Sequence, residues 1–177
     1  EEAAAANIDV ASFDQRASSK DPLMSSGLST AEDIASIKRR EHYALGYVLR
    51  SGETIEKWVL PVHGYGLWSI LYGFIALEGD ANTVAGITFY EHGETAGLGG
   101  EVDNPAWKGI WPGKEIYGSD GTVALKVAKG AVDPNAKGAK YQVDGLSGAT
   151  LTSRGVENMV AYWLGDEGYG PILKNMQ

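Results

Sequence analysis

The segment "DGLSGATLTSRGVENMVAYWL" (residues 144–164) decides the fold, because it joins a glycine-rich turn to an apolar helical pattern. The apolar residues recur every three or four positions and predict one buried helical stripe. They are Val156, Met159, Val160, Trp163 and Leu164. Gly165 and Gly168 predict the end of this helix. A hydroxyl residue ahead of the stripe predicts a side-chain N-cap, with Thr152 or Ser153 in that role.

Capping does not account for the turn at residues 147–150, "SGAT". A glycine-rich turn that enters a helix is a potential anion site, because backbone N–H groups converge there. The segment lacks the lysine of a P-loop and the G-x-G-x-x-G of a dinucleotide fold. It also resembles a nucleophile elbow, but His42, His63 and His92 all precede Ser147, against the chain order of α/β-hydrolases. Ser147 is therefore interpreted as a hydroxyl donor in an anion-binding turn.

Upstream of this helix the sequence is dominated by strand patterns. "YALGYVLR" and "IEKWVL" flank "SGET" and predict a hairpin. Further strands are predicted at residues 67–77, where both alternating faces are apolar as in a strand covered on both sides, and at 83–90 and 122–129. A helical pattern occurs at residues 29–42, and residues 104–111 suit a short helix or a turn. The sum is an α+β fold, with a mostly antiparallel sheet and helices packed on it.

Composition excludes several classes of function. The chain has 177 residues, a formal net charge of −8 and no cysteine. The negative charge argues against nucleic-acid binding, and the absence of cysteine excludes disulfides, iron–sulfur clusters and cysteine nucleophiles. No apolar run is long enough to span a bilayer. The chain opens with "EEAAAAN" and no methionine, so we expect a trimmed start from which a native signal or anchor was removed.

Four segments together resemble the FMN-binding domain family. "DGLSGATLTS" is similar to the covalent flavin-attachment motif of that family. "PVHGYGLWSILYGFIAL", "VAGITFYEHGETAGLGGEVDNPAWKG" and "YWLGDEGYGPIL" occur in the family's order and spacing, over about residues 58–173. The family includes the C subunits of sodium-translocating NADH:quinone oxidoreductases and the G subunits of Rnf-type electron transport complexes. The W-L-G-D-x-G-x-G-P tail favours the C subunits.

The resemblance implies that Thr150 carries FMN through a phosphoester to its side-chain oxygen. Gly148 and Ala149 would leave room for the phosphate, while Thr152 and Ser153 would donate to its oxygens. A threonine hydroxyl is a weak nucleophile without a base, and none lies beside Thr150 in the sequence. The family accordingly implies a separate flavin transferase that moves FMN from FAD.

The second part of the site implied by the resemblance is the turn "HGETAGLGG". Its residues are expected to approach the isoalloxazine ring: Glu94, Thr95, Gly97, Leu98 and Gly99. Glu94, the only charged residue of this group, is expected to tune the flavin potential. Of the tryptophans, Trp68 is the candidate for stacking on the ring, whereas Trp107, Trp111 and Trp163 are expected in the core. Neither a metal ligand nor a catalytic residue is predicted; His63 and His92 are expected at the surface or hydrogen-bonded.

The function implied is that of an electron-carrying subunit within an NADH:ubiquinone reductase (Na⁺-transporting). Residues 43–177 would form the FMN-binding domain, and residues 1–42 a polar, partly helical lead-in that follows a membrane helix absent from this chain. The family places such a domain on the periplasmic side of the bacterial inner membrane, beside the other subunits of the complex. Two alternatives are an Rnf-type G subunit and a flavin-free binding or assembly module on the same fold. Thr150 within S-G-A-T favours a flavin protein over the second.

Overall fold

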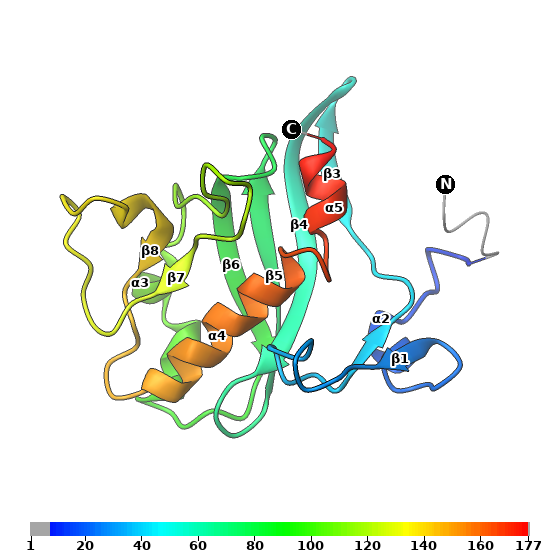
Figure 1. Cartoon of the computed structure of the whole chain (residues 1–177), viewed down its shortest axis with the longest axis horizontal. Helices are drawn as coiled ribbons and strands as arrows, with labels where there is room; N and C mark the ends of the chain where they lie inside the picture. The colour runs from blue at the N-terminus through cyan, green and yellow to red at the C-terminus, as the bar shows by residue number, and fades with distance from the viewer. Residues whose placement is uncertain (1–7, 177) are drawn as a thin grey trace.

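The computed structural model describes residues 8–176, so the opening segment interpreted as a trimmed start lies outside the described residues. A four-stranded sheet and one long helix form the centre of the molecule (Figure 1). The elements are α2 (Gln15–Ser18), β1 (Ser25–Gly27), β2 (Arg39–Glu41), β3 (Tyr47–Ser51), β4 (Thr54–Tyr65), β5 (Ile70–Glu78), β6 (Val84–Glu91), η1 (Gly99–Asp103), α3 (Pro105–Lys108), β7 (Lys126–Val127), η2 (Ala139–Tyr141), β8 (Gln142–Val143), α4 (Thr150–Trp163) and α5 (Gly170–Lys174).

Strands β3, β4, β5 and β6 form an antiparallel meander in chain order. The predicted hairpin is confirmed: β3 and β4 are joined at Gly52, whose φ of 61° suits a tight hairpin turn. Along β5 every second side chain is buried and the intervening ones are half-buried. The strand predicted at residues 67–77 is confirmed from Ile70 onward, whereas residues 67–69 form a bend ahead of it, and only one face of the strand lies fully in the core.

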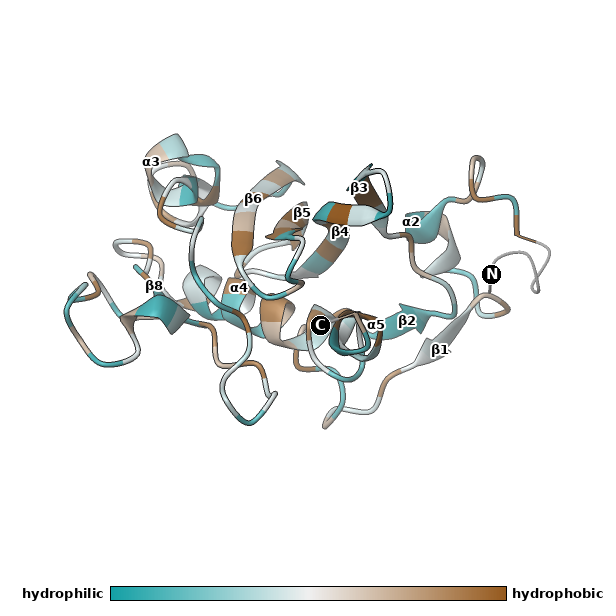
Figure 2. Ribbon diagram, turned by 90° about the horizontal axis from the view of Figure 1, so that it is seen from above, coloured by the Kyte–Doolittle hydropathy of each residue, from teal (hydrophilic) through white to brown (hydrophobic). Residues whose placement is uncertain are grey.

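Helix α4 packs against the buried face of this sheet and completes the core. Figure 2 shows the sheet as one layer, with α4 and α5 forming a second layer beneath it. All five residues of the predicted helical stripe are buried. They meet the buried residues of the strands, which include Leu60, Val62, Leu71, Ile75 and Leu77. The predicted α+β architecture is confirmed, and the sheet fixes where the start of α4 lies.

The helix predicted at residues 29–42 does not form. The chain instead makes turns up to residue 35, and Ser36 and Lys38 have positive φ values of 54° and 68°. The carboxylate of Asp33 accepts hydrogen bonds from the backbone N–H groups of Ile37 and Lys38, at 2.7 and 2.8 Å. This side chain offers the backbone an alternative to helical bonding, which explains why a helical sequence pattern ends in a loop.

The strand predicted at residues 122–129 is mostly wrong as well. Only Lys126 and Val127 form a strand, β7, and it pairs in parallel with β8. The N–H of Val127 donates to the carboxylate of Glu157 on α4 instead of to a neighbouring strand. Leu125 and Val127 are nevertheless buried, so the alternation identified the correct inward face without a regular strand. The short helix predicted near residue 105 is confirmed as α3.

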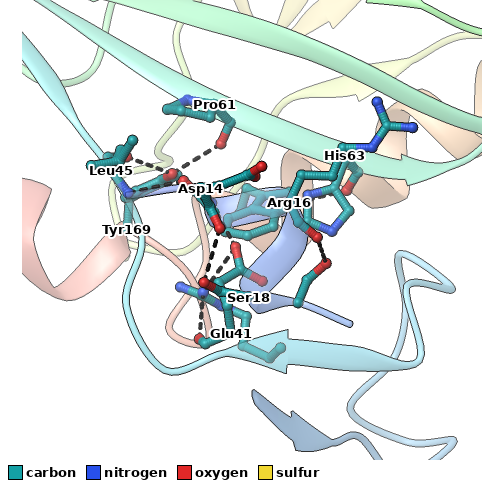
Figure 3. Close-up of polar contacts among 12 residues, drawn as sticks. Asp14, Arg16, Ser18, Glu41, Leu45, Pro61, His63 and Tyr169 are labelled. Carbon is teal, nitrogen blue, oxygen red and sulfur yellow. Dashed lines mark hydrogen bonds and ion pairs between the residues drawn. The ribbon is translucent and has the colours of Figure 1, made fainter. Parts of the chain in front are cut away.

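Polar contacts fasten the N-terminal segment to the sheet and to Tyr169 (Figure 3). Arg16 forms two hydrogen bonds of 2.7 Å with the carboxylate of Glu91, and its guanidinium lies 3.9 Å from the ring centroid of Tyr72. The hydroxyl of Tyr169 lies 2.9 Å from the carbonyl oxygens of both Leu45 and Pro61. Within residues 8–176 no helix has both the length and the apolar character needed to cross a membrane.

Candidate functional site

The candidate site is built around the first turn of α4, which begins at Thr150. The N-cap position is occupied by Ala149, and no side chain of the described residues caps the helix there. The predicted capping by Thr152 or Ser153 is therefore wrong, because both residues already lie inside the helix. The hydroxyl of Ser153 accepts the N–H of Leu146 at 2.9 Å, which closes the turn that precedes the helix.

The backbone N–H groups of the first turn have the character of an anion site. In the part of the chain that the structure describes, those of Thr150, Leu151 and Thr152 have no hydrogen-bond acceptor. The first turn also contains no acidic residue, although acidic residues are favoured at that position. Free N–H groups and the positive end of the helix dipole together favour an anion beside the exposed Thr150.

The turn ahead of the helix requires Gly148. Its φ of 69° lies in the left-handed region, and a Cβ at this position would come 3.0 Å from Cδ2 of Leu98. The motif at residues 147–150 and the turn at residues 94–99 are therefore neighbours in space. Within the second turn, Gly97 has a φ of 75°, and the carbonyl of Thr95 accepts the N–H groups of Leu98 and Gly100. The two sequence motifs thus form one site.

Glu94 is the buried member of this site, with 8% of its surface exposed. Its Oε1 accepts the backbone N–H groups of Leu67, Trp68 and Ser69, at 3.0, 2.9 and 3.2 Å. Its Oε2 accepts the hydroxyl proton of Thr152 at 2.6 Å. Burial acts to raise the pKa of Glu94, but these hydrogen bonds outweigh it, so the pKa is lowered and the group is a carboxylate.

The role expected for Glu94 in tuning a flavin stays a prediction, and the contacts of its side chain speak against it. The carboxylate is directed into the protein and is occupied by four donors. It is therefore a poor candidate for the charge that tunes a flavin ring from the open side of the site. The hydroxyl proton of Thr152 is likewise committed to Glu94, and Thr152 is fully buried.

Exposed apolar side chains surround the start of α4. Trp68 is 66% exposed, Leu98 44% and Leu151 58%. Large apolar side chains at a site lined by glycine and hydroxyl groups suit contact with a flat aromatic ligand. By contrast Trp107, Trp111 and Trp163 are buried in the core, as predicted.

Among the described residues, neither of the two histidines near these motifs forms a hydrogen bond with the first turn of α4, although Nδ1 of His92 accepts the N–H of Glu94 at 3.2 Å. His63 is not in a surface turn but within β4, where its ring lies 5.6 Å from that of Tyr72 and 4.9 Å from that of Trp163. His92 Nε2 lies 2.9 Å from Oδ2 of Asp103. Residues 8–176 contain no cluster of three or more metal-ligating side chains.

Three residues of the site were not singled out from the sequence. Leu151 follows the S-G-A-T motif but lies outside the helical stripe, so an exposed apolar residue there was a usable signal. Gly66 and Gly155 gave no such signal. A Cβ on Gly155 would lie 2.4 Å from the carbonyl oxygen of Tyr65, and one on Gly66 would lie 2.6 Å from Oε1 of Glu94. Their role is close approach, which depends on segments far apart in the chain.

The fold and this site define a class of flavin-binding protein. The family model described as FMN-binding domain matches residues 66–165, more than half of the chain. The match includes β5, β6, both turns of the site and helix α4. The chain therefore belongs to the FMN-binding domain family.

Within that family the chain is a close homologue of the C subunits of Na(+)-translocating NADH-quinone reductases. It is 54% identical to the Pseudomonas aeruginosa protein over 165 residues, which cover 93% of this chain and 63% of the relative. The Vibrio anguillarum protein is 48% identical over 169 residues, covering 96% and 65%. This chain thus spans slightly less than two thirds of the length of these relatives.

Solved structures show the same relationship. The crystal structure of Shewanella oneidensis NqrC superposes with a TM-score of 0.85 at 37% identity, covering 94% of this chain and 75% of that one. The C subunit from Parabacteroides distasonis gives a TM-score of 0.62 at 32% identity, with 84% and 71% covered. The predicted family and fold class are confirmed.

Proposed function

We propose that this chain is an electron carrier whose FMN is attached to the hydroxyl oxygen of Thr150 through a phosphoester. The observation that carries the proposal is the start of α4. An exposed threonine stands there beside three backbone N–H groups that have no acceptor among residues 8–176. A phosphate diester is a monoanion, and a helix start of this kind stabilises one.

The residues present fit an FMN group. The free N–H groups of Thr150, Leu151 and Thr152 would hold the phosphate, and the turn at Ser147 and Gly148 gives it open space. Trp68, Leu98 and Leu151 provide apolar surface for the ring system, and backbone groups of residues 95–99 are candidates for its polar edge. When bound, the flavin supplies the electron-transfer chemistry, and the protein supplies position and electrostatics.

Attachment requires an outside catalyst. The hydroxyl of Thr150 has no hydrogen-bond partner among residues 8–176, so no base within them activates it. In the proposed transfer, the threonine oxygen forms a bond to the phosphorus on the FMN side of FAD. The bond from that phosphorus to the oxygen of AMP breaks, AMP leaves, and the hydroxyl proton passes to a base of a flavin transferase. The glycine and alanine beside Thr150 leave the hydroxyl accessible to such an enzyme.

The wider assignment rests on the homology to the C subunits. We infer that the complete protein is one subunit of a sodium-translocating NADH:quinone reductase, and that it works beside the other subunits of that complex. In this assignment residues 43–177 form the FMN-binding domain on the periplasmic side of a bacterial inner membrane. Residues 1–42 connect it to a membrane helix. The matches to the C subunits favour this complex over an Rnf-type one.

The attachment is tested by Thr150→Val. The purified apo-protein is incubated with flavin transferase, FAD and Mg²⁺, and the adduct is measured by intact mass and located by peptide mapping. Wild type should gain one flavin phosphate at Thr150, and Thr150→Val none, because the attacking oxygen is lost from an exposed position. Thr150→Ser, which keeps a hydroxyl, should still be labelled.

Two results would contradict the proposal. One is a flavin adduct on Thr150→Val that survives denaturing electrophoresis, which would place the acceptor elsewhere. The other is labelling of wild type by FAD and Mg²⁺ without the transferase, which would contradict the absence of an internal base. Circular dichroism of the two variants controls for folding.

A further inference from the structure

Three segments that are distant in sequence meet at one carboxylate. Glu94 follows β6; the N–H groups that it binds belong to residues 67–69, between β4 and β5; and Thr152 belongs to α4. The segments are also tied next to the carboxylate, because the N–H of Gly93 donates to Oγ of Ser69 at 2.6 Å. All three segments carry proposed contacts of the flavin: Trp68 in the first, Leu98 in the turn that contains Glu94, and Thr150 in α4.

The carboxylate of Glu94 is packed so closely that two neighbouring positions have no room for a side chain. A Cβ on Gly66 would lie 2.6 Å from Oε1 of Glu94. A Cβ on Gly99 would lie 2.6 Å from Oε2 of Glu94 and 2.5 Å from Oγ1 of Thr152. All three distances are shorter than real Cβ contacts. Gly66 and Gly99 thus contact the carboxylate at positions where a side chain would not fit.

The two carboxylate oxygens of Glu94 bind different segments. Oε1 fixes the backbone that carries Trp68, and Oε2 fixes the side chain of Thr152, two residues after Thr150. Because the bonds to a buried carboxylate are charge-assisted, they are stronger and more directional than those between neutral groups. One side chain thus sets the distance between the proposed ring contact and the attachment hydroxyl.

We propose that Glu94 is a positioning residue for flavin attachment. It holds the first turn of α4 and the turn that carries Trp68 in the relative placement that transfer to Thr150 requires. This inference rests on the proposed function, and it assigns Glu94 to the attachment reaction, not to the potential of the flavin. A misplacement of reacting groups by about 1 Å can slow a reaction by about a hundredfold, so loss of the tie should be measurable.

The test measures the rate at which purified transferase labels purified apo-protein, over a range of apo-protein concentrations. Glu94→Gln removes the charge, and Thr152→Val removes the hydroxyl while keeping the side-chain shape. Thr152→Ser restores the hydroxyl. Asp80→Asn is the matched control, because Asp80 accepts the N–H groups of Asn82 and Thr83 and the hydroxyl of Thr83 in the β5–β6 turn.

We expect kcat for labelling to fall by at least about tenfold in Glu94→Gln and Thr152→Val. Thr152→Ser and Asp80→Asn should stay within about twofold of wild type, although Asp80→Asn also loses stability. Urea unfolding of each variant separates placement from folding. If Glu94→Gln does not fold, Thr152→Val and its serine counterpart decide the question alone.

Labelling of Thr152→Val and Glu94→Gln at the wild-type rate would overturn the inference and leave the proposed function standing. A slowdown that Asp80→Asn shares to the same extent would also overturn it, because the effect would then follow stability alone. Labelling of wild type at a residue other than Thr150 would instead overturn the proposed function. That outcome is read directly from the peptide map.

Discussion

At the scale of a single residue, His63 shows how the core changes the chemistry of a side chain. It lies in β4 between the rings of Tyr72 and Trp163, and its carbonyl oxygen accepts the indole N–H of Trp163 at 2.6 Å. Burial, followed by the positive charges of Arg40 and Arg16, lowers the pKa of His63 from 6.5 to about 4. The imidazole is therefore neutral in the folded protein down to low pH.

This shift predicts a loss of stability in acid. Between pH 6.5 and pH 4 the unfolded state binds the proton and the folded state does not, so the free energy of unfolding decreases as the pH falls through that range. Urea unfolding at pH 7.5 and pH 4.5 should show a loss that is about 2 kcal/mol smaller in His63→Gln than in wild type. Replacement of the exposed His42 by Gln is the control. An equal loss in wild type and His63→Gln would contradict the assignment.

At the scale of the element, α4 is placed by how closely it approaches the turn after β4. Gly155 faces that turn: a Cβ there would lie 2.4 Å from the carbonyl oxygen of Tyr65 and 2.9 Å from Cα of Gly66. Both atoms belong to the backbone, which cannot rotate away as a side chain can. The helix lies this close to the sheet only because the residue has no side chain, and this approach brings Thr152 to Glu94.

Gly155→Ala should therefore destabilise the protein, although alanine favours helices by about 1 kcal/mol over glycine. The clash with backbone should cost more than that gain, for a net loss of at least about 1 kcal/mol in urea unfolding. Gly86→Ala is the matched control, because no atom lies within 4 Å of a Cβ at that position in β6. A stabilised Gly155→Ala protein would show that α4 has room to move.

At the scale of the whole molecule, Tyr169 joins parts that are far apart in sequence. The ring is buried and lies 5.5 Å from that of Trp163. Its hydroxyl reaches the carbonyl oxygen of Leu45, which leads into β3, and that of Pro61 in β4 (Figure 3). The C-terminal turn, the N-terminal segment and the sheet are thus held by one hydroxyl group.

Tyr169→Phe keeps the ring and removes the hydroxyl, which leaves both carbonyl oxygens without this donor. We expect the free energy of unfolding to fall by about 1 to 2 kcal/mol. Limited proteolysis should cut the segment before β3 faster than in wild type. Tyr90→Phe, at a tyrosine that is 58% exposed, should change neither measurement. Equal protease sensitivity of the two variants would show that other contacts hold this segment.

The sequence alone determined the parts of the protein that depend on local pattern. The alternation in β4 to β6, the apolar stripe of α4 and the hairpin at Gly52 follow from side-chain periodicity and turn chemistry, which act over a few residues. The S-G-A-T motif and its position at a helix start were likewise visible in residues 144–164. The predictions of the fold class and of the family rested on these features.

Tertiary structure decided what depends on contacts between distant segments. Glu157 of α4, 30 residues away, took the hydrogen bond that a strand at Val127 needed, whereas Asp33 ended a helical pattern by a local contact that periodicity does not record. Glu94 could be located in its turn from the sequence, but its four donors lie 25 to 58 residues away, so the direction of its charge could not. Periodicity records which face of an element is buried, but not which polar group a buried carboxylate meets. That pairing follows only from the packing of the sheet, the turn and the helix together.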